Sequence, residues 1–176
     1  MKKVKFTFIL MISLLIAGCG FHLRGNQDLS SVLPEVQIQG VSKHSELGRE
    51  LTRVLIAANV NVLDESEVLI SISKDSFSRR VLSLDSSGRA NQYELSYLLS
   101  FSLLKKLNTE DKKDRLVDLM ATQNISEKRE YLFDANLILA KTDEEERLNN
   151  DMRQAALLQL VRRLKFSLKS KNKVSK

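Results

Sequence analysis

Few side chains in this chain of 176 residues could carry out catalysis. It holds one cysteine and two histidines, and the first histidine, His22, lies three residues after the cysteine. His44 stands beside Lys43 at the start of a predicted helix, without the spacing of a catalytic triad or a metal site. The six glycines do not cluster into a phosphate-binding loop. We therefore predict that the chain is not an enzyme and has no catalytic residue, no metal site and no cofactor.

Arginine and lysine side chains offer a second kind of chemistry, the recognition of phosphate groups. The two basic sets are Arg79, Arg80 and Arg89 around a predicted turn, and Lys128, Arg129 and Lys141 further along the chain. Guanidinium groups at a rigid hairpin tip suit bidentate contacts with phosphate. The alternative, favoured for the second set, is that the charges are solvated strand-edge residues that discourage aggregation.

Residues 1–18 have the pattern of a secretory signal peptide, with three early lysines followed by an apolar run from Phe6 to Ala17. That run is too short for a membrane-spanning helix, which needs roughly 20 apolar residues. The segment Ile16-Ala17-Gly18-Cys19 resembles the lipobox of bacterial lipoproteins. The resemblance implies cleavage before Cys19, an N-acyl diacylglycerol anchor on that residue, and outer-membrane sorting because Gly20 replaces aspartate. The alternative is a free or buried thiol.

The positive charge is concentrated at the two ends of the chain. The formal net charge is +6, but three lysines belong to the signal and seven cations fall within residues 162–176, where no acid occurs. Residues 19–161 carry 18 basic and 22 acidic side chains, a net charge of −4. An exported chain meets no nucleic acid, so its available polyanions are lipopolysaccharide phosphates and anionic lipids. The alternative for this basic segment is a helix end followed by disordered lysines.

Hydrophobic periodicity predicts the secondary structure of the remainder. We expect a strand at 35–40, a helix that starts after Ser42 or Ser45 and stops at Asn59, and long strands between 67 and 131. A bulge is allowed at 74–80, and turns are expected at 85–89 and 108–113. The acidic run 143–146 indicates the start of a last helix that ends near Leu168, rather than a cation site.

These elements predict one α+β domain at 35–168. It is a two-layer sandwich in the order βαβββα, in which a mixed four-stranded sheet with long strands carries two helices on one face. Residues 19–34 are predicted to form a lipidated tether and 169–176 a basic disordered tail. Strands of about 16 residues span about 50 Å, so the turn at 85–89 should project beyond the packed body, where a partner or ligand is met.

Four segments resemble the LptE family of lipopolysaccharide-assembly lipoproteins. They are Cys19-Gly20-Phe21-His22-Leu23-Arg24, Tyr93-Glu94-Leu95, Leu139-Ala140-Lys141, and Arg153 to Leu164. The resemblance implies a non-catalytic lipoprotein, lipid-anchored on the periplasmic face of the outer membrane. It also implies a 1:1 complex in which the protein plugs an LptD-type translocon β-barrel, assists its assembly and binds lipopolysaccharide.

The resemblance implies that Arg89 lies at the ligand-facing tip and that Lys141 is a basic residue following the last strand. With Arg79 and Arg80, these residues are the candidate lipopolysaccharide-binding set. A freestanding periplasmic binding or inhibitor lipoprotein is the alternative function. An enzyme acting on envelope glycans is disfavoured because no paired carboxylates can be placed on one face.

Overall fold

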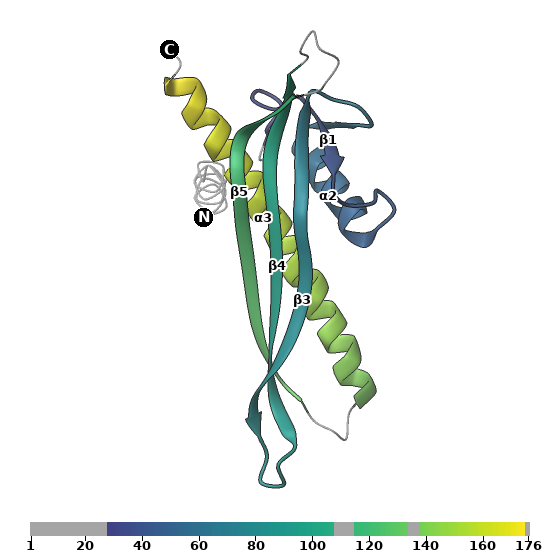
Figure 1. Cartoon of the computed structure of the whole chain (residues 1–176). Coiled ribbons are helices and arrows are strands. Elements are labelled where there is room, and N and C mark those ends of the chain that lie inside the picture. Colours follow the sequence, from purple (N-terminus) through teal and green to yellow (C-terminus); the bar gives the residue numbers. More distant parts are fainter. Residues whose placement is uncertain (1–27, 108–114, 134–137, 175–176) are drawn as a thin grey trace, which may run out of the picture.

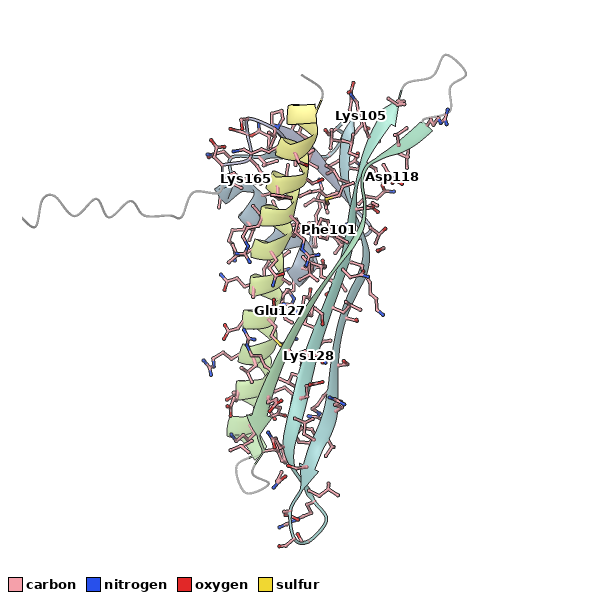
Figure 2. All side chains as sticks on the ribbon, turned by 90° about the vertical axis from the view of Figure 1, so that its left-hand side faces the viewer. Phe101, Lys105, Asp118, Glu127, Lys128 and Lys165 are labelled. Carbon is pink, nitrogen blue, oxygen red and sulfur yellow. The ribbon has the colours of Figure 1, made fainter. Side chains whose placement is uncertain are left out.

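The computed structural model describes residues 28–107, 115–133 and 138–174, and these form two layers. One layer is a five-stranded sheet in the order β2-β1-β3-β4-β5, and both helices, α2 and α3, cover the same face of it (Figures 1 and 2). The elements are β1 (Glu35–Gln39), α2 (Glu46–Ala57), β2 (Asn61–Leu63), β3 (Val68–Leu84), β4 (Ala90–Leu107), β5 (Arg115–Leu132) and α3 (Ile138–Val174). The predicted α+β sandwich with a mixed sheet is confirmed.

The first unit is a crossover in which β1 pairs in parallel with both β2 and β3. The Ser45 side chain caps α2 by accepting the Gly48 N–H at 3.1 Å, and Asn59, at a φ of 60°, follows its end. The predicted count of four strands was wrong, because β2 forms a fifth. Its three residues are too few to show an alternating pattern in the sequence.

The predicted alternation of β4 is confirmed and supplies the centre of the core. Its helix-facing side chains are at most 1 % exposed, and these are Leu95, Tyr97, Leu99, Phe101 and Leu103. The two helices cover them with buried leucines and smaller apolar residues, including Leu51 of α2 and Leu160 of α3. A single apolar cluster therefore joins the sheet to both helices.

Irregularities in register change the side-chain phase in two strands, β3 and β5. In β3 the register shifts between Ile72 and Lys74, at the edge of the predicted bulge, and again beyond Val81. In β5 the register shifts twice, opposite the segment from Phe101 to Leu103 and again before Leu104, and Met120 lies in the core opposite Leu103. The expectation that Val117 is buried was wrong: it pairs with Lys105 near the start of the strand and is 39 % exposed.

The last helix is longer than predicted at both ends. It begins at Ile138 rather than at the acidic run, so this run does not occupy the first turn, and it continues past Leu168 to Val174. No glycine or proline interrupts it. The predicted disordered tail is thus helical as far as Val174, and residues 175–176 lie outside the described ranges. Among the described helices, neither is long and apolar enough to cross a membrane.

The predicted tether gives way to packed structure before residue 34. Leu29 and Leu33 are buried in the core, and the Leu29 N–H donates to the Ala58 carbonyl at 2.9 Å. This packing could not be predicted from the sequence, because the residues around Leu29 and Leu33 show neither helical nor strand periodicity. The signal at 1–18, Cys19 and the turn at 108–113 lie outside the described residues.

An ion pair with a buried arginine joins α2 to α3. The Arg153 side chain of α3 is 9 % exposed, and its Nη1 lies 2.8 Å from Glu46 Oε1 and 4.0 Å from Glu50 Oε2 of α2. Leaving this guanidinium unpaired would be costly, so the pair fixes where the short helix sits along the long one.

We predict that two glycines with similar backbone angles differ in their tolerance of alanine. Gly40 has a φ of +85°, and a Cβ there would lie 2.1 Å from the Ile72 carbonyl oxygen; Gly88 has a φ of +80° with nothing within 4 Å. Gly88→Ala should lower the free energy of unfolding by only about 1 kcal/mol, the cost of a left-handed alanine. Gly40→Ala should lower it by more, measured by urea unfolding. Equal losses would contradict the close packing of Gly40 on β3.

Candidate functional site: the projecting hairpin and its charges

The β3–β4 hairpin projects past the beginning of α3 and carries the turn at 85–89 (Figure 1). The turn is closed by the Asp85 N–H, which donates to the Arg89 carbonyl at 2.7 Å, and by Gly88, whose positive φ permits the chain reversal. The projection predicted from the strand lengths is therefore confirmed. Three of the four candidate residues, Arg79, Arg80 and Arg89, lie on this hairpin.

Asp85 organises the turn and holds Arg89. Its Oδ1 accepts the Ser87 hydroxyl at 2.6 Å and the backbone N–H groups of Ser87 and Arg89 at 2.8 and 2.9 Å. These donors, led by the Ser87 hydroxyl, lower the pKa of Asp85 to about 2. The Arg89 Nε lies 3.2 Å from Asp85 Oδ2, yet the Arg89 side chain is 71 % exposed. Arg89 is thus oriented by a local pair and open to an anionic ligand.

Arg79 and Arg80 lie on opposite faces of the sheet, because successive side chains of a strand alternate. Arg79 faces α3, where its Nη1 donates to Glu145 Oε2 at 2.8 Å. Arg80 faces the side without helices and pairs with Glu94 of β4. The structure therefore does not bring the three arginines into one cluster.

Arg79 belongs to an aromatic and acidic cluster between the hairpin and α3. Its guanidinium lies 4.8 Å from the centre of the Tyr93 ring, which stacks on Tyr131. The Tyr131 hydroxyl donates to Glu145 at 2.7 Å, and burial, with this carboxylate, raises the pKa of Tyr131 to about 12. The hydrogen bond from Arg79 to Glu145 raises the pKa of Arg79. The acidic run predicted to start the helix instead joins it to the sheet.

A cavity of about 340 Å³ opens beside this cluster. Its lining residues are Phe77, Arg79, Thr142, Glu145, Glu146 and Asn149. Because the lining offers charges of both signs, Arg79 can meet an anionic group here only in competition with Glu145.

Glu94 joins two cations across three strands on the other face. Its Oε1 lies 2.8 Å from Arg80 Nε and 3.5 Å from Lys128 Nζ of β5, while its own side chain is only 11 % exposed. The hydrogen bond from Arg80, with the two positive charges, lowers the pKa of Glu94. Figure 2 labels Lys128 beside Glu127, which accepts a hydrogen bond from Gln159 of α3 on the opposite face. The sequence did not indicate that Glu94 would pair with Arg80 and Lys128, because such cross-strand pairs depend on the register between β3, β4 and β5.

Lys141 follows the last strand, β5, and lies in the first turn of α3. Its Nζ donates to Glu144 Oε2 at 2.6 Å, one helical turn along, and its side chain is only 18 % exposed. Of the four candidates it is the least accessible to a ligand.

The projecting end also exposes large apolar side chains, which the sequence analysis did not single out. They are Val81, Leu82, Leu84 and Leu132, with exposures from 37 to 68 %. Alternating apolar residues at a strand end ordinarily indicate core, so only the projection beyond α3 identifies them as surface. The end of the hairpin thus combines cationic and apolar chemistry.

The described residues contain no group of three His, Cys, Asp or Glu side chains that could hold a metal ion. His44 lies exposed just before α2, where its backbone N–H donates to Ser42 Oγ at 3.3 Å. Its surroundings match the helix-end position expected from the sequence.

Solved structures with this arrangement of helices and sheet are those of bacterial lipoproteins. Lipoprotein B from Nitrosomonas europaea matches with a TM-score of 0.62 and 31 % identity, over 81 % of this chain and 88 % of that one. The rare lipoprotein B from Shewanella oneidensis matches with a TM-score of 0.57 and 26 % identity, over 78 % and 96 % of the two chains. The fold therefore defines an envelope lipoprotein class.

Sequence comparisons identify the family within that class. The model of the family described as LptE, lipopolysaccharide-assembly, matches residues 33–164, so the chain belongs to the LptE family. The LPS-assembly lipoprotein LptE of Photorhabdus laumondii is 27 % identical over 162 residues, which cover 90 % of this chain and 84 % of that protein. The corresponding protein of Pectobacterium atrosepticum is 28 % identical over 170 residues, covering 93 % and 86 %. A role as a lipoprotein of lipopolysaccharide assembly in cell-envelope biogenesis follows.

We predict that Glu94→Gln destabilises the protein more at pH 7 than at acidic pH. The pKa of Glu94 is lower in the folded chain than the unfolded value of about 4.3. Its stabilising contribution is therefore present above the unfolded pKa and is lost as pH falls through the folded pKa. The difference between the urea midpoints of variant and wild type should be largest at pH 7 and should shrink as the pH is lowered below the unfolded pKa. Glu65→Gln, at an exposed loop position, is the control; a Glu94 difference that does not shrink with falling pH would contradict the ion-pair account.

Proposed function

We propose that the protein is a non-catalytic subunit of the lipopolysaccharide translocon, anchored to the periplasmic face of the outer membrane. The anchor is the N-acyl diacylglycerol on Cys19, and the partner is an LptD-type β-barrel in a 1:1 complex whose assembly the protein assists. The support is family membership, the names of the curated relatives and the resemblance of residues 16–19 to a lipobox.

The projecting hairpin is the observation that carries the ligand assignment. Lipopolysaccharide presents phosphate groups together with acyl chains, so a surface that binds it must offer cations beside exposed apolar side chains. Arg80 and Arg89 are 67 and 71 % exposed, and they share the hairpin with Val81, Leu82 and Leu84. We assign first contact with the ligand to this end.

The four candidate residues have different parts in this proposal. Arg89 and Arg80 contact phosphate directly, since both remain open while paired with one carboxylate each. Arg79 and Lys141 are less exposed, and their partners Glu145 and Glu144 both belong to α3. They bind phosphate only when those acidic partners are displaced.

The sheet face without helices is the surface assigned to the barrel. Strand β4 presents Ser96, Ser100 and Ser102, which are small and polar, and the Ser100 hydroxyl donates to Asn124 Oδ1 at 2.7 Å. Short side chains permit close approach of the barrel wall. An obligate complex of this kind should bury more than about 2,000 Å² of surface in total.

We predict that Arg89→Glu weakens lipopolysaccharide binding by about tenfold, equivalent to about 1.4 kcal/mol. The reversal places a negative charge beside Asp85 at the tip, so a phosphate group would be repelled. Fluorescence titration of the purified lipoprotein with lipopolysaccharide measures the affinity, and circular dichroism checks that the variant is folded. Arg147→Glu, an exposed change on α3, is the matched control. Equal affinity of the two variants would remove Arg89 from the site.

A pull-down of the full-length lipoprotein from outer membranes in mild detergent tests the proposed complex. One large β-barrel protein at a 1:1 ratio is the expected result. Recovery of the lipoprotein without a barrel would contradict the proposal and favour a freestanding binding lipoprotein.

A further inference from the structure

The carboxyl-terminal part of α3 exposes an aromatic ring among cations, at the end of the molecule away from the hairpin tip (Figure 1). Phe166 is 78 % exposed, the highest value of any large apolar side chain in the described residues. It borders a cavity of about 380 Å³ between α3 and β5. The lining residues are Met120, Gln123, Arg162, Arg163, Phe166, Ser167 and Ser170. Phe166 lies on a polar face of the helix and contributes nothing to the core. Such an exposed apolar side chain is typical of a surface that binds another apolar group.

Two of the cations near Phe166 have no acidic partner in the part of the chain that the structure describes. No acidic residue follows Asp151 in the sequence. Among the described residues, neither Arg162 nor Lys169 has an ion-pair partner. Arg163 donates to the backbone carbonyl of Asn124 at 2.8 Å. This acceptor is neutral, so the hydrogen bond positions the Arg163 side chain without cancelling its positive charge. The surface is therefore suited to a polyanion.

The chain enters the described fold at this same place. Asp28 lies close enough to Lys165 for the lysine charge to act on its carboxylate, and Leu29 is buried in the adjoining core. Figure 2 shows Lys165 near the carboxyl-terminal end of α3. Asp28 is the ninth residue after Cys19, so the two residues can lie at most about 32 Å apart. An acyl anchor on Cys19 would thus keep this end of the domain near the membrane.

The neighbouring strand ends have the same mixed character. Leu107 of β4 and Leu116 and Val117 of β5 are each about 40 to 50 % exposed. Figure 2 places Lys105 of β4 at the same end of the molecule as Lys165. Exposed apolar groups interspersed with lysine and arginine are typical of surfaces that lie at a lipid headgroup boundary.

We propose that this end of the domain, centred on Phe166 with Arg162, Arg163 and Lys169, docks on anionic phospholipid headgroups of the membrane that carries the anchor. The inference rests on the proposed acylation of Cys19 and adds a second, non-covalent contact. Phe166 enters the interface while the cations meet lipid phosphates. A second copy of the chain is a poor occupant, because it would bring the same positive surfaces together. The contact orients the domain with its hairpin tip directed away from the membrane surface.

Tryptophan fluorescence tests the docking directly, since the chain contains no tryptophan. The full-length acylated protein carrying Phe166→Trp is reconstituted into vesicles of phosphatidylethanolamine and phosphatidylglycerol with brominated acyl chains, which quench nearby indoles. Leu84→Trp, at the hairpin tip and 60 % exposed, is the matched control. The expected result is at least twofold quenching at position 166 and little at position 84. Absence of quenching at 166, or equal quenching at both, would overturn the proposal.

A charge variant tests the anionic part of the inference. In the Phe166→Trp background, Arg162→Gln with Lys169→Gln should reduce the quenching by at least half, as should vesicles of phosphatidylethanolamine alone. Unchanged quenching in both arms would overturn the assignment to anionic lipid.

Vesicle flotation separates this inference from the function on which it rests. Protein that does not float would contradict the acyl anchor, and the docking with it. Protein that floats while the indole at position 166 remains unquenched would contradict the docking alone.

Discussion

The packing of α3 against the apolar face of β3, β4 and β5 is the interaction on which the rest of the structure depends. Strands of 17 and 18 residues expose a long one-sided apolar surface, and only an element of similar length can cover it. A helix of 37 residues spans about 55 Å, close to the length of β3. The short α2 covers the remainder and is held in place by Arg153.

This packing gives the molecule two different ends. Beyond the start of α3 the hairpin has no helix to cover it, so its apolar and basic side chains face outward, ordered by the network around Asp85. Toward the other end of α3, Arg162 and Lys169 have no ion-pair partner among the described residues, and Lys165 lies near Asp28, where the described fold begins. The sheet between them pairs its charges internally, as Glu94 does with Arg80 and Lys128. The proposed ligand contact and the proposed membrane contact therefore fall at opposite ends of the two-layer domain.

Much of the fold could be predicted from side-chain periodicity, whereas the pairing of charges could not. The alternation in β4 and the cap at Ser45 are local signals, and both were confirmed. The three-residue β2 is too short to have a period, and the bulge that buries Met120 depends on the partner strand. The separation of Arg79 from Arg80 follows from strand alternation, but their partners Glu145 and Glu94 come from tertiary packing and register. The sequence therefore groups the four candidate residues into one set, which the structure divides between two faces of the sheet and α3.

The most direct test of the two-ended account is site-specific photo-crosslinking in living cells. A photoreactive benzophenone side chain would replace Ser86 at the exposed tip in one strain and Arg147 on α3 in another. The account predicts an adduct containing lipopolysaccharide from position 86 and none from position 147. Adducts of equal yield from both positions, or none from position 86, would contradict it.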